Sequence, residues 1–435
     1  MLRRRPMPTL IAFITVTIDL LGFGLVLPLL PVYADHLMPH FSTLTRNVLI
    51  GLLMASFSAM QFLFAPLWGR ASDRFGRRPI LLIGLFGSVL FYLLLALASG
   101  WKSVALLFVA RIGAGICGAT IGTAQAVIAD CTPPERRAAG MALIGMAFGI
   151  GFTIGPVIGA FSLAREGDEP SVIPGLAAAA LSLAAFMLAW LVMPETRKTD
   201  VAAARPWWPG AAWRLALSQR ATAVPILTFF LTTLAFASFE SILARYARDE
   251  IFSQWDAQIS AHWSGLHQLS QQTRICLLFA YVGVILMIMQ GLVVRKLVLF
   301  VGEAHMVRLG IGLMLSALIL MALWSAGGAL GITLLALALA VAGFAFCTPA
   351  LQALVSRGTD PAQQGQILGV NQSAASLSRI LGPLLGNALY GPKHGTHQLP
   401  YYAAAVLLLL AFSLTLTLRP AESLPVSDTL PSVSP

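Results

Sequence analysis

The sequence predicts an all-α integral membrane protein, with twelve transmembrane helices in two parallel six-helix repeats around a central cavity. Three observations point to this fold class. Hydrophobic residues make up 57% of the 435-residue chain and charged residues 11%, whereas about a quarter of the residues in soluble domains are charged. Apolar stretches of roughly 20 residues, the length that a membrane-spanning helix needs, occur about twelve times. Part of the second half of the chain also repeats the first.

The first apolar stretch follows three arginines, in MLRRRPMPTLIAFITVTIDLLGFGLVLPLLP. It is too long for a secretory signal and contains an acid, Asp19, so we interpret it as the first helix. Asp19 lies about ten residues into this helix, roughly at the middle of the membrane. Acids inside a membrane face the interior of the bundle and are functional candidates. Asp19 is therefore either a site that binds and releases protons or a protonated acid that holds a neighbouring helix by a hydrogen bond.

The segment GRASDRFGRRP, residues 69–79, joins the second and third predicted helices. Its arginines hold the segment at the cytosolic surface of the membrane. An anchor needs only basic residues, whereas Asp73, Gly69 and Gly76 indicate a shaped contact. Glycine permits a close approach of two backbones, and an acid can face the N-terminus of a helix. The segment therefore predicts a cytosolic gate in addition to a topological anchor.

The distribution of charge sets the predicted orientation and the division of the chain. With the N-terminus inside, most of the 28 Lys and Arg residues fall in inward segments, as expected for an N-in, C-in protein. The net charge of +10 thus follows from topology, and no nucleic-acid partner is expected. The basic segment 194–221 separates an N-terminal half, residues 1–193, from a C-terminal half, residues 222–419. Residues 420–435, rich in Pro and Ser, form a tail that we expect to be disordered.

An internal repeat supports the division into two halves. Residues 132–159 align without a gap on residues 359–386, at a constant offset of 227. Identical positions include Thr132 and Thr359, Pro134 and Pro361, Gly155 and Gly382, Pro156 and Pro383, and Gly159 and Gly386. The fifth helix thus recurs as the eleventh, which indicates two halves in the same orientation.

Three more ionisable residues fall inside predicted helices. Arg111 must find an anion or backbone carbonyls within the bundle. Glu240 has three open roles, which are substrate binding, proton coupling and pairing with Arg245. Arg379 is expected to meet either Glu240 or an anionic substrate. The neutral polar residues inside the helices either line the cavity or form interhelical hydrogen bonds, and they are Gln61, Gln125, Asn371 and Gln372.

Several motifs resemble the major facilitator superfamily, in particular its twelve-helix drug:proton antiporter branch, which includes the tetracycline exporters. The loop between helices two and three is similar to the superfamily signature at Gly69, Asp73, Arg74, Gly76, Arg77 and Arg78. RIGAG, which starts at Arg111, resembles the signature of helix four. GFTIGPVIGA resembles the antiporter signature of helix five through Gly151, Gly155, Pro156 and Gly159. TIDLLGFGLVLPLLP, which contains Asp19, is similar to the first helix of this branch.

The resemblance implies roles for these motifs. The loop would close the cytosolic side by tying helix two to helix eleven and to the end of helix four, where Asp130 would pair with Arg74 or Arg77. Arg111 would modulate the protonation of a nearby carboxylate, in particular Asp19. The glycine-rich face of helix five is expected to pack tightly against its neighbours. Tetracycline exporters carry further acids in helices three and nine that this sequence lacks, so a neutral or cationic lipophilic substrate is expected.

The predicted function is proton-coupled export of a small lipophilic organic compound or drug by alternating access. The alternative is proton-coupled uptake of a small metabolite or sugar. A membrane-embedded enzyme is disfavoured because the sequence contains no HExxH or GxSxG motif, and a non-transporting receptor is a further, disfavoured class. We expect no cofactor and no metal. The expected partners are a small-molecule substrate, protons and the lipid bilayer, for a monomer in the bacterial inner membrane.

Overall fold

The computed structural model describes residues 8–26, 43–166, 171–197, 209–247, 271–324, 330–390 and 398–418, and these residues form helices joined by turns. The predicted tail 420–435 and residues 248–270 of the long outward loop lie outside the described residues. The first group of helices comprises α1 (Pro8–Val26), α3 (Thr43–Phe75), α4 (Arg77–Gly100), α5 (Val104–Gly118), α6 (Ile121–Cys131), α7 (Arg137–Glu166) and α8 (Ile173–Val192). After the short helix α9 (Pro209–Ser218), the second group comprises α10 (Arg220–Tyr246), α12 (Gln271–Ile288), the π-helix η3 (Met289–Val294), α13 (Arg295–Val301), α14 (Glu303–Trp324), α15 (Leu330–Arg357), α16 (Gln364–Leu389) and α17 (Leu399–Thr415).

The helices have the length and composition of a multi-pass membrane protein. In the part of the chain that the structure describes, nine segments are long and apolar enough to cross a membrane, and two shorter apolar helices lie within α1 and α17. α16 is neither one of these nine segments nor one of the shorter apolar helices, because its sequence is rich in Gln, Asn and Ser. The all-helical fold class is confirmed. That the chain crosses the membrane twelve times, with both ends inside, stays a prediction.

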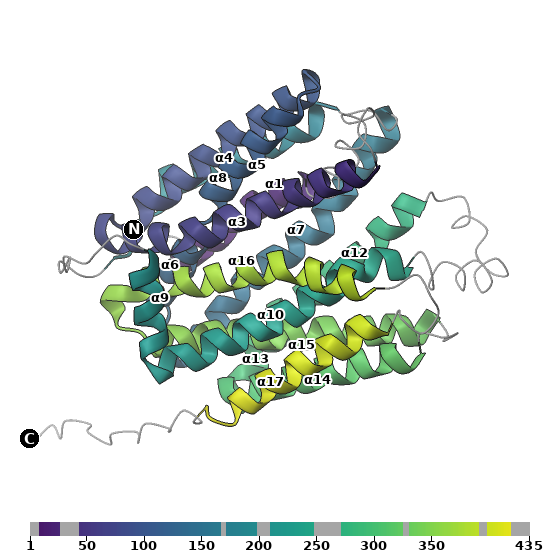
Figure 1. Ribbon diagram of the computed structural model, residues 1–435. Helices are drawn as coiled ribbons and strands as arrows, with labels where there is room; N and C mark the ends of the chain where they lie inside the picture. Colours follow the sequence, from purple (N-terminus) through teal and green to yellow (C-terminus); the bar gives the residue numbers. More distant parts are fainter. Residues whose placement is uncertain are drawn as a thin grey trace, which may run out of the picture.

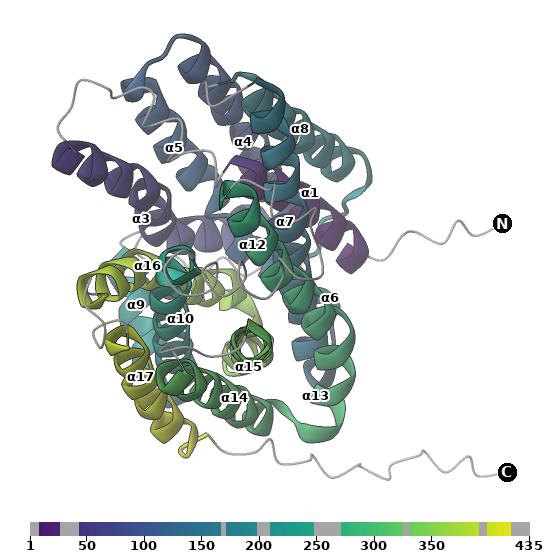
Figure 2. The same cartoon turned by 90° about the vertical axis from the view of Figure 1, so that its right-hand side faces the viewer.

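The two groups of helices lie side by side and meet along their central members. Figure 1 shows α4, α5 and α8 on one side of the molecule, α14 and α17 on the other, and α3, α7, α12 and α16 between them. The principal contacts between the groups are those of α3 with α16 and of α7 with α12 and α15. Figure 2, at right angles to this view, again shows α4, α5 and α8 on the side opposite α14 and α17. α9 packs on α3, α10 and α16 at one end of the molecule, which we call the loop end because the junction of α3 and α4 lies there too.

The repeat in the sequence is also a repeat in the structure. A single turn of 3-10 helix, Pro134–Arg136, precedes α7, and another, Pro361–Gln363, precedes α16. α7 starts at Arg137 and α16 at Gln364, so the two starts are separated by the offset of 227 found in the sequence. Proline suits the first positions of such turns because its missing N–H would have no partner there.

The predicted fourth helix is interrupted, which the sequence analysis did not anticipate. α5 ends at Gly118 and α6 begins at Ile121, so a short break at Ala119 and Thr120 divides the element. The sequence RIGAGICGATIG contains four glycines, and glycine is the poorest helix former after proline. The break lets α6 pack against α16 at the loop end.

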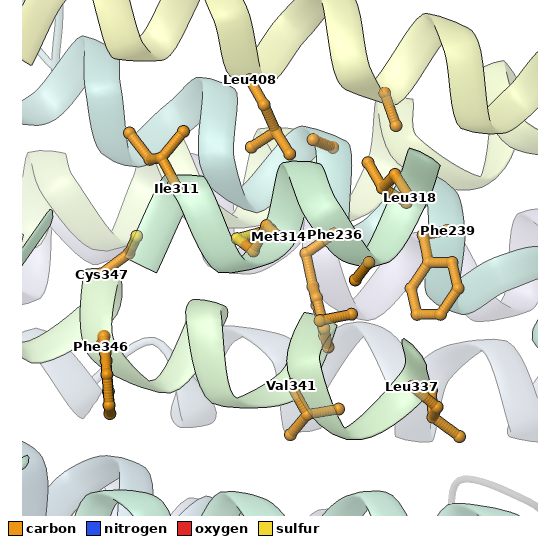
Figure 3. Close-up of a cluster of buried hydrophobic side chains, with 14 of the residues drawn as sticks. Phe236, Phe239, Ile311, Met314, Leu318, Leu337, Val341, Phe346, Cys347 and Leu408 are labelled. Carbon is orange, nitrogen blue, oxygen red and sulfur yellow. The ribbon is translucent and has the colours of Figure 1, made fainter. Parts of the chain in front are cut away.

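The largest cluster of buried apolar side chains lies in the second group of helices. Figure 3 shows part of it, with Ile311, Met314 and Leu318 of α14 packed between side chains of α10, α15 and α17. The rings of Phe236 and Phe344 stack at a centroid distance of 4.1 Å, which adds to the stability gained from burial. This cluster joins α10, α14, α15 and α17.

The crossing of α14 and α15 allows a direct test of helix packing. Gly310 and Gly343 face each other, and a Cβ atom at position 343 would lie 2.7 Å from Met314 Cγ and 2.9 Å from its backbone nitrogen. We expect Gly343→Leu to destabilise the protein by about 1–3 kcal/mol through overpacking, seen as a lower thermal unfolding temperature in detergent. Gly312→Leu is the control, because a Cβ atom there meets nothing within 4 Å. Equal unfolding temperatures for the two variants would contradict this packing.

Candidate functional site

Asp73 joins the two halves at the loop end. It lies in the last turn of α3, and its carboxylate accepts hydrogen bonds from the backbone N–H groups of Gly365 (2.9 Å) and Gln366 (2.7 Å). Both N–H groups belong to the first turn of α16, where they have no partner within the helix. A carboxylate at this position is further stabilised by the helix dipole. Asp73 therefore caps α16 from the opposite half.

A buried arginine holds the Asp73 carboxylate in place. Arg77, at the start of α4, is 2% exposed and pairs with Asp73 at 2.5 Å and with Asp130 at 3.1 Å. It also donates a hydrogen bond to Ser72 Oγ at 2.7 Å. Of the two expected partners of Asp130, the structure thus forms the pair with Arg77. The network connects the ends of α3, α4 and α6 to the start of α16.

Glycine permits the close approach of α3 and α16. A Cβ atom at Gly69 would meet the carbonyl group of Gly365, and a Cβ atom at Gly369 would lie 3.0 Å from the Ala65 carbonyl carbon. A side chain at Gly69 would therefore force the two helices apart. The closure of the loop end depends on the absence of side chains at these positions as much as on the charges.

The remaining residues of the predicted gate shape the turn between α3 and α4. Gly76 has a φ of 106°, a conformation that glycine adopts without strain. Arg78 donates to the Trp190 carbonyl at 2.6 Å. Arg74 is exposed, and its guanidinium lies 5.3 Å from the centre of the Phe75 ring. Glu195, which the sequence analysis missed, accepts hydrogen bonds from the N–H groups of Arg77 and Arg78. The PETR sequence directly after α8 was the available signal.

The second half contains a matching ion pair with the charges exchanged. Glu303, at the start of α14, pairs with Arg357, at the end of α15, at 2.7 Å. Arg357 occupies the position of Asp130 at the repeat offset of 227, which was the signal in the sequence. Arg357 also donates to the Pro134 carbonyl of the first half at 2.8 Å, and Arg137 donates back to the Ser356 carbonyl at 3.0 Å. These bonds form a second connection between the halves.

We expect Arg357→Met to destabilise the protein by about 3 kcal/mol, because Glu303 is 6% exposed and would be left as a nearly buried charge without its partner. The thermal unfolding temperature in detergent measures this effect. The double variant Arg357→Met with Glu303→Gln should recover part of the loss. If the loss of stability in the double variant equals the sum of the losses in Arg357→Met and Glu303→Gln alone, the pair does not act as a unit.

Asp19 lies in the core of the first half. Its carboxylate accepts a hydrogen bond from the Ser182 hydroxyl of α8 at 3.1 Å, and the Ser88 hydroxyl of α4 is its second partner. A small cavity next to it is lined by α1, α4 and α6, with Thr15 and Thr120 as polar neighbours. Hydroxyl groups can donate to a carboxylate or accept from a protonated acid. The site therefore accommodates Asp19 in either protonation state.

Arg111 lies in the same core, although no contact ion pair with Asp19 is formed among the described residues. It is 2% exposed, and its guanidinium lies 4.6 Å from the centre of the Phe57 ring. Tyr92 of α4 interacts electrostatically with both Arg111 and Asp19. An influence of Arg111 on the protonation of Asp19 stays a prediction.

Glu240 and Arg379 interact in the second half. Arg379 of α16 donates hydrogen bonds to Gln61 Oε1 of α3 at 3.2 Å and to Ser376 Oγ at 3.1 Å. Gln61 in turn donates to the Gly118 carbonyl at 3.1 Å. Glu240 of α10 interacts electrostatically with Arg379. The side chain of Arg245, the other expected partner of Glu240, falls outside the described part.

The other predicted cavity residues are buried polar groups. Gln125, Asn371 and Gln372 are 1%, 0% and 3% exposed. Among the described residues, the Gln125 and Asn371 amides and the Gln372 Nε2 have no hydrogen-bond partner. Their role as cavity-lining residues stays a prediction, and the backbone carbonyl of Gln372 accepts a hydrogen bond from the Ser376 hydroxyl.

The glycine-rich face of α7 makes two different contacts. A Cβ atom at Gly151 would lie 2.7 Å from the Leu20 carbonyl of α1, within the same half, while one at Gly149 would lie 2.7 Å from the Met287 backbone nitrogen of α12, in the other half. Gly155 is buried in α7, which also contains Pro156 and Gly159. The contact between halves is made by earlier glycines of the helix rather than by Gly151.

The fold and the site define a multi-pass membrane transporter whose two halves close against each other at one end. The family model described as Major Facilitator Superfamily matches residues 12–383 and 277–433, and the chain belongs to this family. It is 32% identical over 409 residues to the tetracycline resistance protein, class C, of Escherichia coli, covering 91% of this chain and 93% of that protein. It is 31% identical to the class H protein of Pasteurella multocida, covering 88% of each chain.

Solved structures show the same fold. The human organic anion transporter MFSD10 aligns with a TM-score of 0.77 at 25% identity, covering 95% of this chain and 99% of that chain. FucP, a Major Facilitator Superfamily transporter in its outward conformation, aligns with a TM-score of 0.74 at 15% identity, covering the same shares. The predicted family and the predicted fold class are confirmed.

Proposed function

We propose that the protein exports a small lipophilic organic compound in exchange for protons, by alternating access. The observation that carries this proposal is the environment of Asp19, a membrane-embedded carboxyl group whose hydrogen-bond partners are the hydroxyls of Ser182 and Ser88. An acid inside a membrane costs free energy, and such acids are therefore functional candidates. The similarity to tetracycline resistance proteins supports an organic compound as the exported substrate.

The Asp73 network supplies the closed state that alternating access requires. Its hydrogen bonds to Gly365 and Gln366, together with those of Arg137 and Arg357, join the halves at the loop end. We propose that this end faces the cytosol and that the network opens when the halves rock. The division into halves at residues 194–221 and the action as a monomer belong to the same proposal.

Purified protein in liposomes tests this function. The liposomes are loaded with a pH dye and acidified inside, and lipophilic cations, organic anions, neutral drugs including tetracycline, and sugars are added outside in turn. We expect one class of drug-like compound to raise the interior pH by exchange with protons. Entry of a labelled compound without proton release would instead indicate a facilitator, and entry of protons with a sugar would indicate the uptake mechanism.

A further inference from the structure

A guanidinium group lies at the contact of α16 with α3, where the two halves meet. Arg379 belongs to the middle part of α16, and both of its hydrogen bonds leave from Nη2, toward Gln61 of the first half and Ser376 of its own helix. Both acceptors are neutral oxygens. In the part of the chain that the structure describes, Nε and Nη1 donate no hydrogen bond. An arginine carries five N–H donors, so most of its binding capacity is unused.

Within the described ranges, Arg379 interacts with one acid, Glu240, without forming a contact ion pair. Glu240 interacts electrostatically with Arg379, but among the described residues the two do not form an ion pair within 4.0 Å. Both side chains are partly exposed, although they lie within helices of the membrane-embedded bundle. Charged groups inside a membrane face the bundle interior or a water-filled cavity rather than lipid. The partial exposure of the two side chains thus indicates that they face the interior of the bundle.

A second unused donor lies on the same face of α16. Gln372 is 3% exposed, and its Nε2 has no hydrogen-bond partner among the described residues. Positions 372, 376 and 379 are spaced by four and three residues, which places them on one face of a helix. A buried amide donor without an acceptor costs free energy. This face of α16 thus carries N–H donors at Gln372 and, about two turns further on, at Arg379. A ligand that satisfies both must carry hydrogen-bond acceptors.

We propose that Arg379 recognises an anionic group, a carboxylate or a similar oxyanion, on the transported compound, in the space between Arg379 and Glu240. This inference rests on the proposed transport function and names the chemical class of its substrate. Charge-assisted hydrogen bonds from a guanidinium to an oxyanion are about twice as strong as neutral ones. An anionic compound differs from the neutral or cationic compound that the missing acids in helices three and nine favour.

Glu240 competes with the ligand in this arrangement. Arg379 is the charged group that faces Glu240 from α16, and the neighbouring residues of α10 are packed against apolar and aromatic side chains, Phe236 against Phe344 of α15 and Phe239 against Tyr401 of α17. The Glu240 carboxylate supplies part of the negative charge that Arg379 requires. Without the Glu240 charge, the ligand supplies this negative charge by itself, so Arg379 binds the anion more tightly.

The test compares three probes with the same ring system, naphthoate, naphthamide and naphthylmethylamine, on the full chain in phosphatidylcholine nanodiscs at neutral pH. Quenching of tryptophan fluorescence gives the dissociation constants. We expect naphthoate to bind about 10- to 100-fold more tightly than naphthamide, the gain expected of a hydrogen bond to a charged group. Arg379→Gln should remove this preference and Arg379→Lys should keep part of it. Glu240→Gln should strengthen naphthoate binding and leave naphthamide unchanged.

Arg220→Gln is the matched control, because Arg220 is exposed at the start of α10 and its loss changes the net charge equally. It should retain the preference for naphthoate. The proposal is overturned if wild-type protein binds naphthoate no more tightly than naphthamide, or if Arg379→Gln retains the preference. Should Arg379→Gln fail to fold, the decision falls to Glu240→Gln, in which unchanged or weaker naphthoate binding contradicts the proposal.

The binding measurement does not depend on flux, so the two proposals fail separately. A preference for naphthoate that requires Arg379, found with protein that exchanges no protons in liposomes, supports the anion site and contradicts the proposed transport function. Proton exchange driven by lipophilic cations, with no preference for naphthoate, supports the transport function and contradicts the anion site.

Discussion

Asp19→Asn is expected to abolish proton-driven transport and to leave exchange of labelled substrate for unlabelled substrate intact. Asparagine has the shape of aspartate and keeps the hydrogen bond from Ser182, but it cannot bind and release a proton. Loss of the proton site removes coupling to the pH gradient, whereas the alternation of the substrate-loaded halves needs no proton at Asp19. The measurement is substrate flux in liposomes with and without an imposed pH gradient.

Thr15→Val is the matched control for Asp19→Asn. Thr15 lies one turn before Asp19 on α1 and lines the same small cavity, but it does not titrate. The control should retain gradient-driven flux. A wild-type response of Asp19→Asn to the pH gradient would return Asp19 to the structural interpretation, in which it only holds α8 through Ser182.

Asp73→Asn is expected to open the loop end. The substitution removes the negative charge that caps α16 and pairs with Arg77, while one amide oxygen remains to accept a hydrogen bond. Hydrogen bonds to a charged group contribute about 1.5–3 kcal/mol each, so the loss of one shifts the equilibrium between closed and open states by about 10- to 100-fold. Transport should slow because the closed state becomes rare.

Cys131 reports on this opening. It lines a cavity of about 410 Å³ between Asp73, Asp130, Pro361 and their neighbours at the loop end. In a variant in which the other cysteines, Cys117, Cys276 and Cys347, are replaced by serine, Asp73→Asn should speed the alkylation of Cys131 by a hydrophilic maleimide.

Asp360→Asn serves as the control for the gate. Asp360 is an exposed aspartate at the same end, and it caps only its own turn by accepting from the Ala362 N–H at 3.0 Å. It should leave the alkylation rate of Cys131 unchanged. Equal rates in wild type, Asp73→Asn and Asp360→Asn would mean that Asp73 does not hold the halves together.

The sequence determined the fold class and the family, and it located most of the candidate functional residues. Apolar stretches of membrane-spanning length follow from composition alone, because helices satisfy their backbone hydrogen bonds internally and the bilayer demands this. The repeat offset of 227 located the two halves and the equivalent starts of α7 and α16. A charge within an apolar segment costs free energy and so indicates a partner or a function. This argument singled out Asp19, Asp73, Arg77 and Arg379.

The tertiary structure decided which of these residues meet. Asp73 and Gly365 are 292 residues apart in the sequence, and only the packing of α3 on α16 brings a carboxylate to the N-terminus of another helix. The choice of Arg77 rather than Arg74 as partner of Asp130 depends on the turn at Gly76, which buries one arginine and exposes the other. The gap between Glu240 and Arg379 likewise depends on how α10 and α16 are placed, because Coulomb energy is set by distance in space. Sequence patterns identify groups that need partners, and the packed helices assign the partners.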